Sequence, residues 1–115
     1  MQLLSPITVA SRTAPNRVMF GPHVTNLGAD DRSIPARQVA YYERRARGGC
    51  GTIVVEGASV HVSDWPYERA PLAERCGQGW ADIVAACRPH GSLVIASLDH
   101  AGGQSSPPGV RDAYR

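Results

Sequence analysis

Three short segments of this sequence combine reactive side chains with small or rigid residues. GPHVT at residues 21–25, EG at 56–57 and DHAGG at 99–103 each follow a run of apolar, strand-like residues. Glycine and proline bring the backbone close to a bound ligand, and two of the segments add a histidine. Chemistry in parallel sheets gathers at the carboxyl ends of the strands. We therefore predict that these segments form one end of a ligand pocket.

Spacing excludes several common sites. The turn at residues 21–28 lacks the GxGxxG and GxxxxGK[ST] patterns of nucleotide-binding loops, and no serine stands in a GxSxG turn. GGCG at 48–51 precedes a strand rather than a helix, so it predicts a tight turn and not a phosphate site. The chain contains no lysine, which excludes a lysine general base or Schiff base.

The three cysteines, Cys50, Cys76 and Cys87, are odd in number and form no CxxC pair. This spacing predicts neither a disulfide framework nor a metal site made by this chain alone. We expect Cys50 and Cys87 to be small buried apolar residues in a reducing cytoplasm.

Composition predicts one globular domain. The chain has 115 residues, of which 43% are apolar and 19% charged, and its net charge of +2 does not indicate a nucleic-acid partner. No apolar run approaches the ~20 residues that span a bilayer, and the first residues do not resemble a signal peptide. We expect a cytoplasmic protein with no membrane partner.

Apolar periodicity predicts a hairpin followed by alternating strands and helices. Continuous apolar runs predict strands that are buried on both faces, as in parallel sheets. Ser33 is the expected N-cap of the first helix, with Pro35 in its first turn. The expected elements are a hairpin at 7–16, strands at 17–20, 50–55 and 92–98, and helices at 35–47 and 78–88.

This order of elements predicts right-handed βαβ units and a parallel sheet. Two architectures have such a sheet, an open doubly wound sheet and a (β/α)8 barrel. The first turn between strand and helix lacks the glycine fingerprint of a dinucleotide-binding open sheet, which favours the barrel.

Four stretches carry a resemblance to a known family, in the expected order and at the expected separations. They are LSPITV (4–9), PNRVMFGPH (15–23), YYERRARGG (41–49) leading to EG (56–57), and LDHAG (98–102). Together they resemble the start of the old yellow enzyme family of NADH:flavin oxidoreductases. The GPH turn is most similar to the 2,4-dienoyl-CoA reductase and trimethylamine dehydrogenase branch.

The resemblance implies an α/β fold. Residues 1–115 would be a single partial domain with about the first three β/α units of a parallel (β/α)8 TIM barrel, preceded by a short β-hairpin. Because such a barrel takes ~250 residues, the chain would hold an incomplete barrel.

The resemblance also implies an FMN-dependent oxidoreductase. In such an enzyme hydride passes from NAD(P)H through the flavin to an activated C=C bond or a similar acceptor. The family's substrate-binding pair, proton donor and phosphate loops come later in the chain, as do the iron–sulfur cysteines and FAD of the dienoyl-CoA reductase branch. We assign no catalytic residue here and expect the 115-residue chain alone to be inactive.

Five residues match the family's cofactor-binding positions. Pro22, His23 and Val24 match the turn that lies against the isoalloxazine, Gly57 matches a small residue whose amide approaches a flavin carbonyl, and Ser97 stands where glutamine is common. Val24 excludes a covalent flavin link at its position, and the Ser97 hydroxyl has a shorter reach than glutamine.

Two further positions differ from the family's cofactor contacts, and one alternative function stays open. Gly103 stands where arginine is common, and His100 is expected to position a loop. We expect a small-molecule substrate and either a homo-oligomer or the rest of the barrel as partner. The alternative is a noncatalytic α/β binding or assembly module that another chain completes.

Overall fold

Three parallel strands form the central sheet of the fold. They are β3 (Met19–Phe20), β4 (Thr52–Val54) and β6 (Leu93–Ile95), in the order β3-β4-β6. The register sets Phe20 opposite Ile53 and Ile53 opposite Val94. The structure, a computed structural model, describes residues 2–105. The parallel order confirms the prediction of βαβ units.

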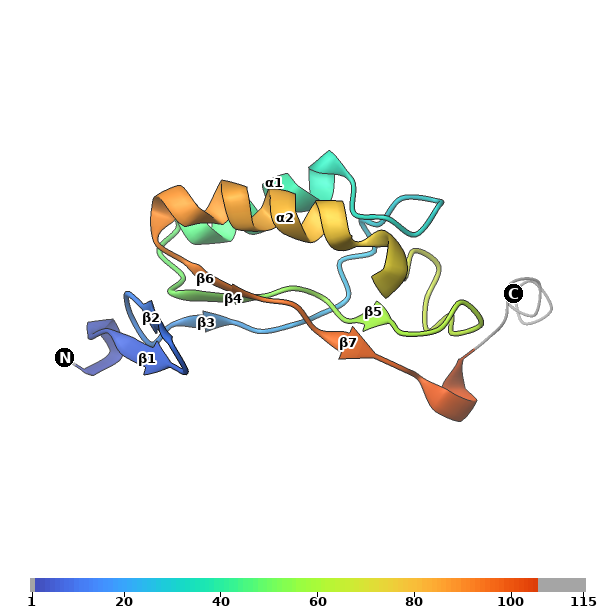
Figure 1. Cartoon of the computed structure of the whole chain (residues 1–115), viewed down its shortest axis with the longest axis horizontal. Coiled ribbons are helices and arrows are strands. Elements are labelled where there is room, and N and C mark those ends of the chain that lie inside the picture. Colours follow the sequence, from blue (N-terminus) through green and yellow to red (C-terminus); the bar gives the residue numbers. More distant parts are fainter. Residues whose placement is uncertain (1, 106–115) are drawn as a thin grey trace.

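Two helices cover one face of this sheet, as Figure 1 shows. α1 (Ala36–Arg47) buries Tyr42 and Ala46, and α2 (Gly77–Cys87) buries Ile83 and Cys87. These side chains pack with Ile53 of β4 in one apolar core. Both predicted helices are confirmed, because apolar residues at helical spacing turn one face of each helix towards the sheet.

The start of α1 differs from the prediction. Pro35 is the N-cap in an extended conformation, and its carbonyl accepts hydrogen bonds from the amides of Gln38 and Val39. Ser33 does not cap the helix, because its hydroxyl donates to the Asp31 carboxylate at 2.6 Å. The helix ends as predicted at Gly48, and Gly49 adopts a φ of +98° that favours glycine.

The predicted N-terminal hairpin is present. β1 (Ile7–Val9) pairs antiparallel with β2 (Arg12–Ala14), and the chain turns at Ala10, which has a φ of +54°. The hairpin lies at the amino-terminal end of the parallel strands, opposite to the loops that carry the candidate site (Figure 1).

The third predicted strand, residues 92–98, is divided in two. β6 ends at Ile95, and the chain continues as β7 (Leu98–Asp99) beside β5 (Ala58–Ser59) in a second parallel pair. The amides of Val55 and Ala58 donate to the carbonyls of Ile95 and Ser97, so the two chains stay together across the break. Short 3-10 helices complete the elements: η1 (Gln2–Leu4), η2 (Ala73–Arg75), η3 (Arg88–His90) and η4 (Gly102–Gln104).

The outer strands are less buried than predicted. Met19 of β3 is 61% exposed, Leu98 of β7 is 63% exposed, and all of β6 is half-buried. The central strand β4 does meet the prediction, with Thr52 and Ile53 buried. The difference arises because β3 and β6 are edge strands, and both helices lie on the same face of the sheet. Cys50, which precedes β4, is likewise only half-buried.

Within the described residues, no helix is long and apolar enough to cross a membrane.

We expect the 115-residue chain to self-associate in solution. β3 and β6 each have a partner strand on one side only, and the Met19 and Leu98 side chains are largely exposed, which together favour pairing with another chain. Analytical ultracentrifugation with thermal melting is the measurement. A 12.3 kDa monomer with a sharp, cooperative transition would contradict this expectation.

We also expect the three cysteines to differ in reactivity. Burial raises the pKa of Cys76 and of Cys87 to about 11, so at pH 8 little of either thiol is ionised. Iodoacetamide at pH 8 should alkylate Cys76 and Cys87 at least ~10-fold more slowly than the half-buried Cys50. Mass spectrometry of the peptides follows the three rates. In urea the rates should become equal, and equal rates without urea would contradict the packing of α2.

Candidate functional site

The five residues that the sequence singles out lie around one hollow. Pro22, His23 and Val24 come from the loop after β3, Gly57 from the loop after β4, and Ser97 from the bend between β6 and β7. The hollow has a volume of about 330 Å³. Parallel strands end at the same edge of a sheet, and this arrangement brings together three segments that lie 33 to 75 positions apart in the sequence.

Three further residues line the hollow. They are Tyr67, from the long loop after β5, and Leu98 and Asp99, from β7. The half-buried Tyr67 contributes an aromatic ring, and Asp99 contributes a carboxylate next to Gly57. The lining of the hollow therefore combines polar groups with apolar side chains.

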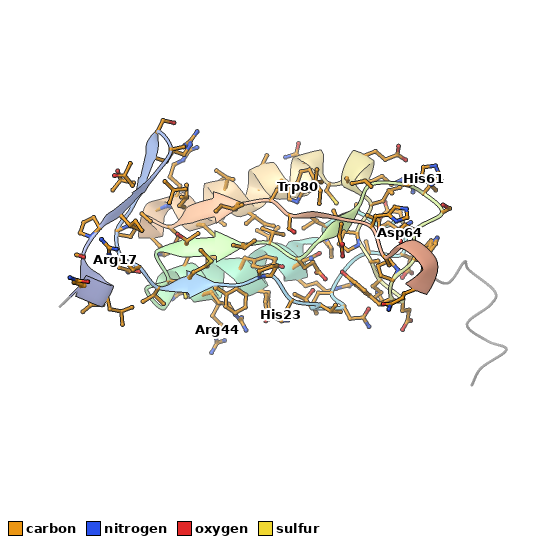
Figure 2. The ribbon with its side chains drawn as sticks, turned by 90° about the horizontal axis from the view of Figure 1, so that it is seen from below. Arg17, His23, Arg44, His61, Asp64 and Trp80 are labelled. Carbon is orange, nitrogen blue, oxygen red and sulfur yellow. The ribbon has the colours of Figure 1, made fainter. Side chains whose placement is uncertain are left out.

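His23 is held by hydrogen bonds at both ring nitrogens. Its Nδ1 lies 3.0 Å from the carbonyl oxygen of Val24, and its Nε2 lies 2.7 Å from the Tyr41 hydroxyl. A carbonyl accepts only, so Nδ1 carries the proton and Nε2 accepts from the Tyr41 hydroxyl. The guanidinium of Arg45 lies 3.4 Å from the centre of the Tyr41 ring. Figure 2 shows His23 on the same side of the molecule as Arg44 of α1, away from Trp80 of α2.

The carboxylate of Glu56, next to Gly57, joins three segments of the chain. Glu56 is 1% exposed. Its two carboxylate oxygens accept hydrogen bonds from the amide and the hydroxyl of Thr25, from the Gln38 amide group and from the Tyr67 hydroxyl. Its own amide donates to the Tyr42 hydroxyl at 2.8 Å. Glu56 thereby ties the loop after β3, helix α1 and the loop after β5 to the end of β4.

Two tyrosines in this network remain neutral phenols. Burial raises the pKa of Tyr42 to about 12. Burial, and then the hydrogen bond to the Glu56 carboxylate, raise the pKa of Tyr67 well above its ordinary value. Tyr67 therefore stays a hydrogen-bond donor throughout the physiological pH range.

A buried arginine holds the loop that carries Tyr67. The Arg32 guanidinium donates to the carbonyl oxygens of Val62, Asp64 and Ala70, at 3.1, 2.7 and 2.8 Å. It also stacks 4.0 Å from the centre of the Trp65 ring. Arg32 thus organises a loop that contains no helix and no strand between Ser59 and Leu72.

Gly57 and Ser97 present hydrogen-bonding groups that no other described residue uses. Within residues 2–105, neither the Gly57 amide nor the Ser97 hydroxyl makes a hydrogen bond. A Cβ atom on Gly57 would lie 2.9 Å from the Cβ of Asp99, closer than such atoms approach. The absence of a side chain keeps this side of the hollow open for a ligand.

A larger hollow, of about 490 Å³, lies at the opposite end of the strands. It is lined by the hairpin, the end of α2 and the start of β6, through Arg12, Thr13, Val84, Arg88, Gly91, Ser92, Leu93 and Val94. We take the smaller hollow as the candidate site, because functional groups of parallel sheets gather at the carboxyl ends of the strands.

Sequence reasoning missed the residues that support the site. Tyr67 lies in a loop with no periodic signal, and nothing local shows that its hydroxyl reaches Glu56. The predicted loop-positioning role of His100 agrees with its contacts, because its Nδ1 accepts a hydrogen bond from the Gly102 amide at 2.9 Å. Among the described residues, no three His, Cys, Asp or Glu side chains are grouped to hold a metal ion.

Parallel strands with a hollow at their carboxyl ends are typical of α/β proteins that bind a ligand there. Residues 2–113 match the model of the NADH:flavin oxidoreductase / NADH oxidase family. The chain belongs to this family, which confirms the resemblance to the old yellow enzymes.

Known relatives agree with this assignment. An NADH oxidase of Thermoanaerobacter brockii is 31% identical over 98 residues, 80% of this chain and 15% of that protein. An N,N-dimethylglycine/sarcosine dehydrogenase of Chromohalobacter salexigens is 27% identical over 96% of this chain and 18% of that protein. The structure of the old yellow enzyme from Trypanosoma cruzi superposes with a TM-score of 0.79 and 27% identity, over 90% of this chain and 28% of that one.

The chain thus spans less than a third of the length of each of these relatives. The predicted fold class is confirmed as α/β with parallel strands, similar to part of the old yellow enzyme barrel. The relatives do not single out one branch, so membership of the 2,4-dienoyl-CoA reductase branch stays a prediction.

We expect that removing the Glu56 carboxylate loosens the loop after β3. In Glu56→Ala, the Thr25 amide loses its acceptor, and buried donors remain unsatisfied at a cost of ~1–3 kcal/mol each. Exchange of the Thr25 amide hydrogen should become at least ~10-fold faster. Hydrogen exchange followed by mass spectrometry of a peptide covering residues 22–28 measures this change.

Two variants control this experiment. Glu56→Gln keeps an oxygen acceptor and should show a smaller effect, and Glu68→Ala, at an exposed position, should show none. Unchanged Thr25 exchange in Glu56→Ala would show that this loop does not depend on Glu56.

Proposed function

We propose that the hollow at Gly57 holds one edge of the FMN isoalloxazine. The protein that contains this chain would then be an FMN-dependent NAD(P)H oxidoreductase that reduces an activated C=C bond or a similar acceptor. The observation that carries the proposal is the convergence of residues 22–24, Gly57 and Ser97 on one hollow. Membership of a family of NADH:flavin oxidoreductases supports it and favours an enzyme over an assembly module.

The donors of the hollow fit the polar edge of a flavin. The Gly57 amide and the Ser97 hydroxyl, unused within residues 2–105, would donate to carbonyl oxygens and ring nitrogens of the pyrimidine edge. Ser97 has one rotatable hydroxyl, so it would reach the ring at short range or through a water molecule. Bound FMN would supply the redox chemistry, taking hydride from NAD(P)H and passing it to the acceptor.

The remaining residues would position the cofactor. Val24 offers only backbone and apolar contact, because its side chain has no nucleophile. The hydrogen bonds of His23 to Val24 and Tyr41, and those of Thr25 to Glu56, would keep the loop after β3 in place against the ring. Tyr67 would close the hollow from the loop after β5 while donating to Glu56.

The chain described here would supply only part of a complete cofactor site. The substrate-binding pair, proton donor and phosphate loops of the family would come from the further length that the relatives have. An iron–sulfur cluster and FAD, a cytoplasmic location and a homo-oligomeric state also stay predictions.

We expect FMN to bind the 115-residue chain more weakly than ~1 μM, because the structure supplies donors for one edge of the ring only. Isothermal titration measures the affinity. At FMN concentrations of several hundred micromolar, hydrogen exchange should slow in peptides that cover residues 21–25 and 56–59. A peptide from α2, residues 79–86, should not change.

A substitution at Gly57 should remove this protection. In Gly57→Leu the new side chain would fill the hollow beside Asp99, whereas Gly103→Leu enters open space and serves as the control. Stoichiometric FMN binding tighter than micromolar would contradict the expected weak affinity. If FMN does not slow hydrogen exchange at residues 21–25 and 56–59, the proposed flavin site is wrong.

A further inference from the structure

Four exposed arginines lie at the amino-terminal end of the parallel strands, opposite the candidate site. They come from the hairpin, the last turn of α1 and η3, which lie at the same end of the fold (Figure 1). None of the four side chains makes a hydrogen bond or an ion pair within residues 2–105. We call this group the basic end, and its members are Arg12, Arg44, Arg47 and Arg88.

Arginines on the side of the candidate site already have partners in the fold. Arg69 lies 3.4 Å from the Asp30 carboxylate, and Arg75 donates to the Asp31 carbonyl oxygen at 2.8 Å. The Arg32 guanidinium donates to three carbonyl oxygens. Folding therefore uses the guanidinium groups at one end as internal donors and leaves those of the basic end available to a partner.

Two hollows are each lined by two of these arginines. Arg12 and Arg88 line the hollow of about 490 Å³, and its lining within residues 2–105 includes no acidic side chain. Arg44 and Arg47 line another hollow, of about 620 Å³, along the end of α1. An anionic group that binds in such a hollow reduces the repulsion between the two guanidinium groups and accepts bidentate hydrogen bonds from them.

A contact between α1 and η3 joins the two hollows into one surface. Glu43 is the one acidic residue that lines the hollow at the end of α1, and its Oε1 lies 3.6 Å from Nε2 of His90 in η3. η3 also contains Arg88, which lines the other hollow. The Glu43 carboxylate therefore has a partner of its own, and the positive charges of both hollows stay uncompensated within residues 2–105.

The chemistry of this surface favours an acidic protein over a nucleic acid. Proteins that bind single-stranded nucleic acid stack its bases on aromatic side chains, and within residues 2–105 no aromatic residue lines either hollow. The surface contains the carboxyl-terminal ends of α1 and α2, so it does not offer a helix N-terminus to phosphates. Because the charges are spread over the hairpin, α1 and η3, a macromolecule would cover them and a small anion would not.

We propose that the basic end is a docking surface for an acidic protein segment, whose aspartate and glutamate side chains pair with its four arginines. The surface and the hollow at Gly57 lie at opposite ends of the strands, so a docked partner leaves that hollow open. The proposal goes beyond the proposed function and does not depend on flavin binding. The expected role is attachment to the partner, with no chemical step.

Three fluorescently labelled decamers of different charge test this proposal. Decaglutamate carries carboxylates, decaglutamine is its neutral counterpart, and a deoxythymidylate decamer carries phosphates. Fluorescence anisotropy measures their binding to the full 115-residue chain. At ~20 mM salt decaglutamate should bind at least ~10-fold more tightly than decaglutamine, and more tightly than the DNA decamer. At ~150 mM salt this preference should become smaller, because salt screens exposed charges.

Two double variants with the same change in net charge locate the binding. Arg44→Gln with Arg88→Gln removes one guanidinium from each hollow and should weaken decaglutamate binding at least ~3-fold. Arg69→Gln with Arg75→Gln removes two guanidinium groups at the other end and should change it by less than ~1.5-fold. Bound decaglutamate should slow hydrogen exchange in peptides that cover residues 41–49 and 84–92, and not in those that cover 21–25 and 56–59.

Three results would overturn the proposal. The first is equal binding of decaglutamate and decaglutamine, or an equal loss of binding in the two double variants. The second is tighter binding of the DNA decamer, which would assign the surface to a nucleic acid. The third is a loss of self-association in Arg44→Gln with Arg88→Gln on ultracentrifugation, which would show that the surface binds a second copy of this chain.

Discussion

The buried carboxylate of Glu56 is the interaction on which the candidate site depends. Burying a carboxylate costs several kcal/mol unless donors surround it. Here four hydrogen bonds meet it, from Thr25, Gln38 and Tyr67. These donors come from three segments that are distant in the sequence, so one carboxylate adds a common contact to all three. The hollow beside Gly57 forms next to this junction.

The parallel sheet positions the segments that meet at Glu56, and its small size leaves its outer strands partly exposed. β4 lies between β3 and β6 and is covered by helices, so the strand that precedes Glu56 and Gly57 is held in place by its neighbours. β3 and β6 each have a partner on one side only, and both helices lie on one face. The residues that rim the hollow, Pro22 to Val24, therefore follow an edge strand. Their position depends on side-chain hydrogen bonds more than on burial.

The hollow is lined by two neutral hydrogen-bond donors and by one carboxylate. Neutral donors, the Gly57 amide and the Ser97 hydroxyl, suit a flat polar ring with carbonyl oxygens. The exposed Asp99 carboxylate accepts a hydrogen bond from the His100 amide through one oxygen. Gly57 lies next to Asp99, where a Cβ atom on Gly57 would come within 2.9 Å of the Asp99 Cβ. The loop held by Arg32 adds Tyr67 as a neutral wall, since its phenol remains protonated.

The sequence by itself determined the elements and the edge at which the site lies. Helical and strand-like apolar spacing, together with Gly48 and Gly49, predicted α1, α2 and the parallel strands, because these signals act over a few residues. Strand direction placed residues 21–25, 56–57 and 99–103 at one edge of the sheet in advance, and the family resemblance then singled out residues 22–24, 57 and 97. Only the tertiary structure decided which residues support them. The Tyr67 hydroxyl on Glu56 and the break of the third strand both arise from contacts between segments distant in sequence, for which no local pattern exists.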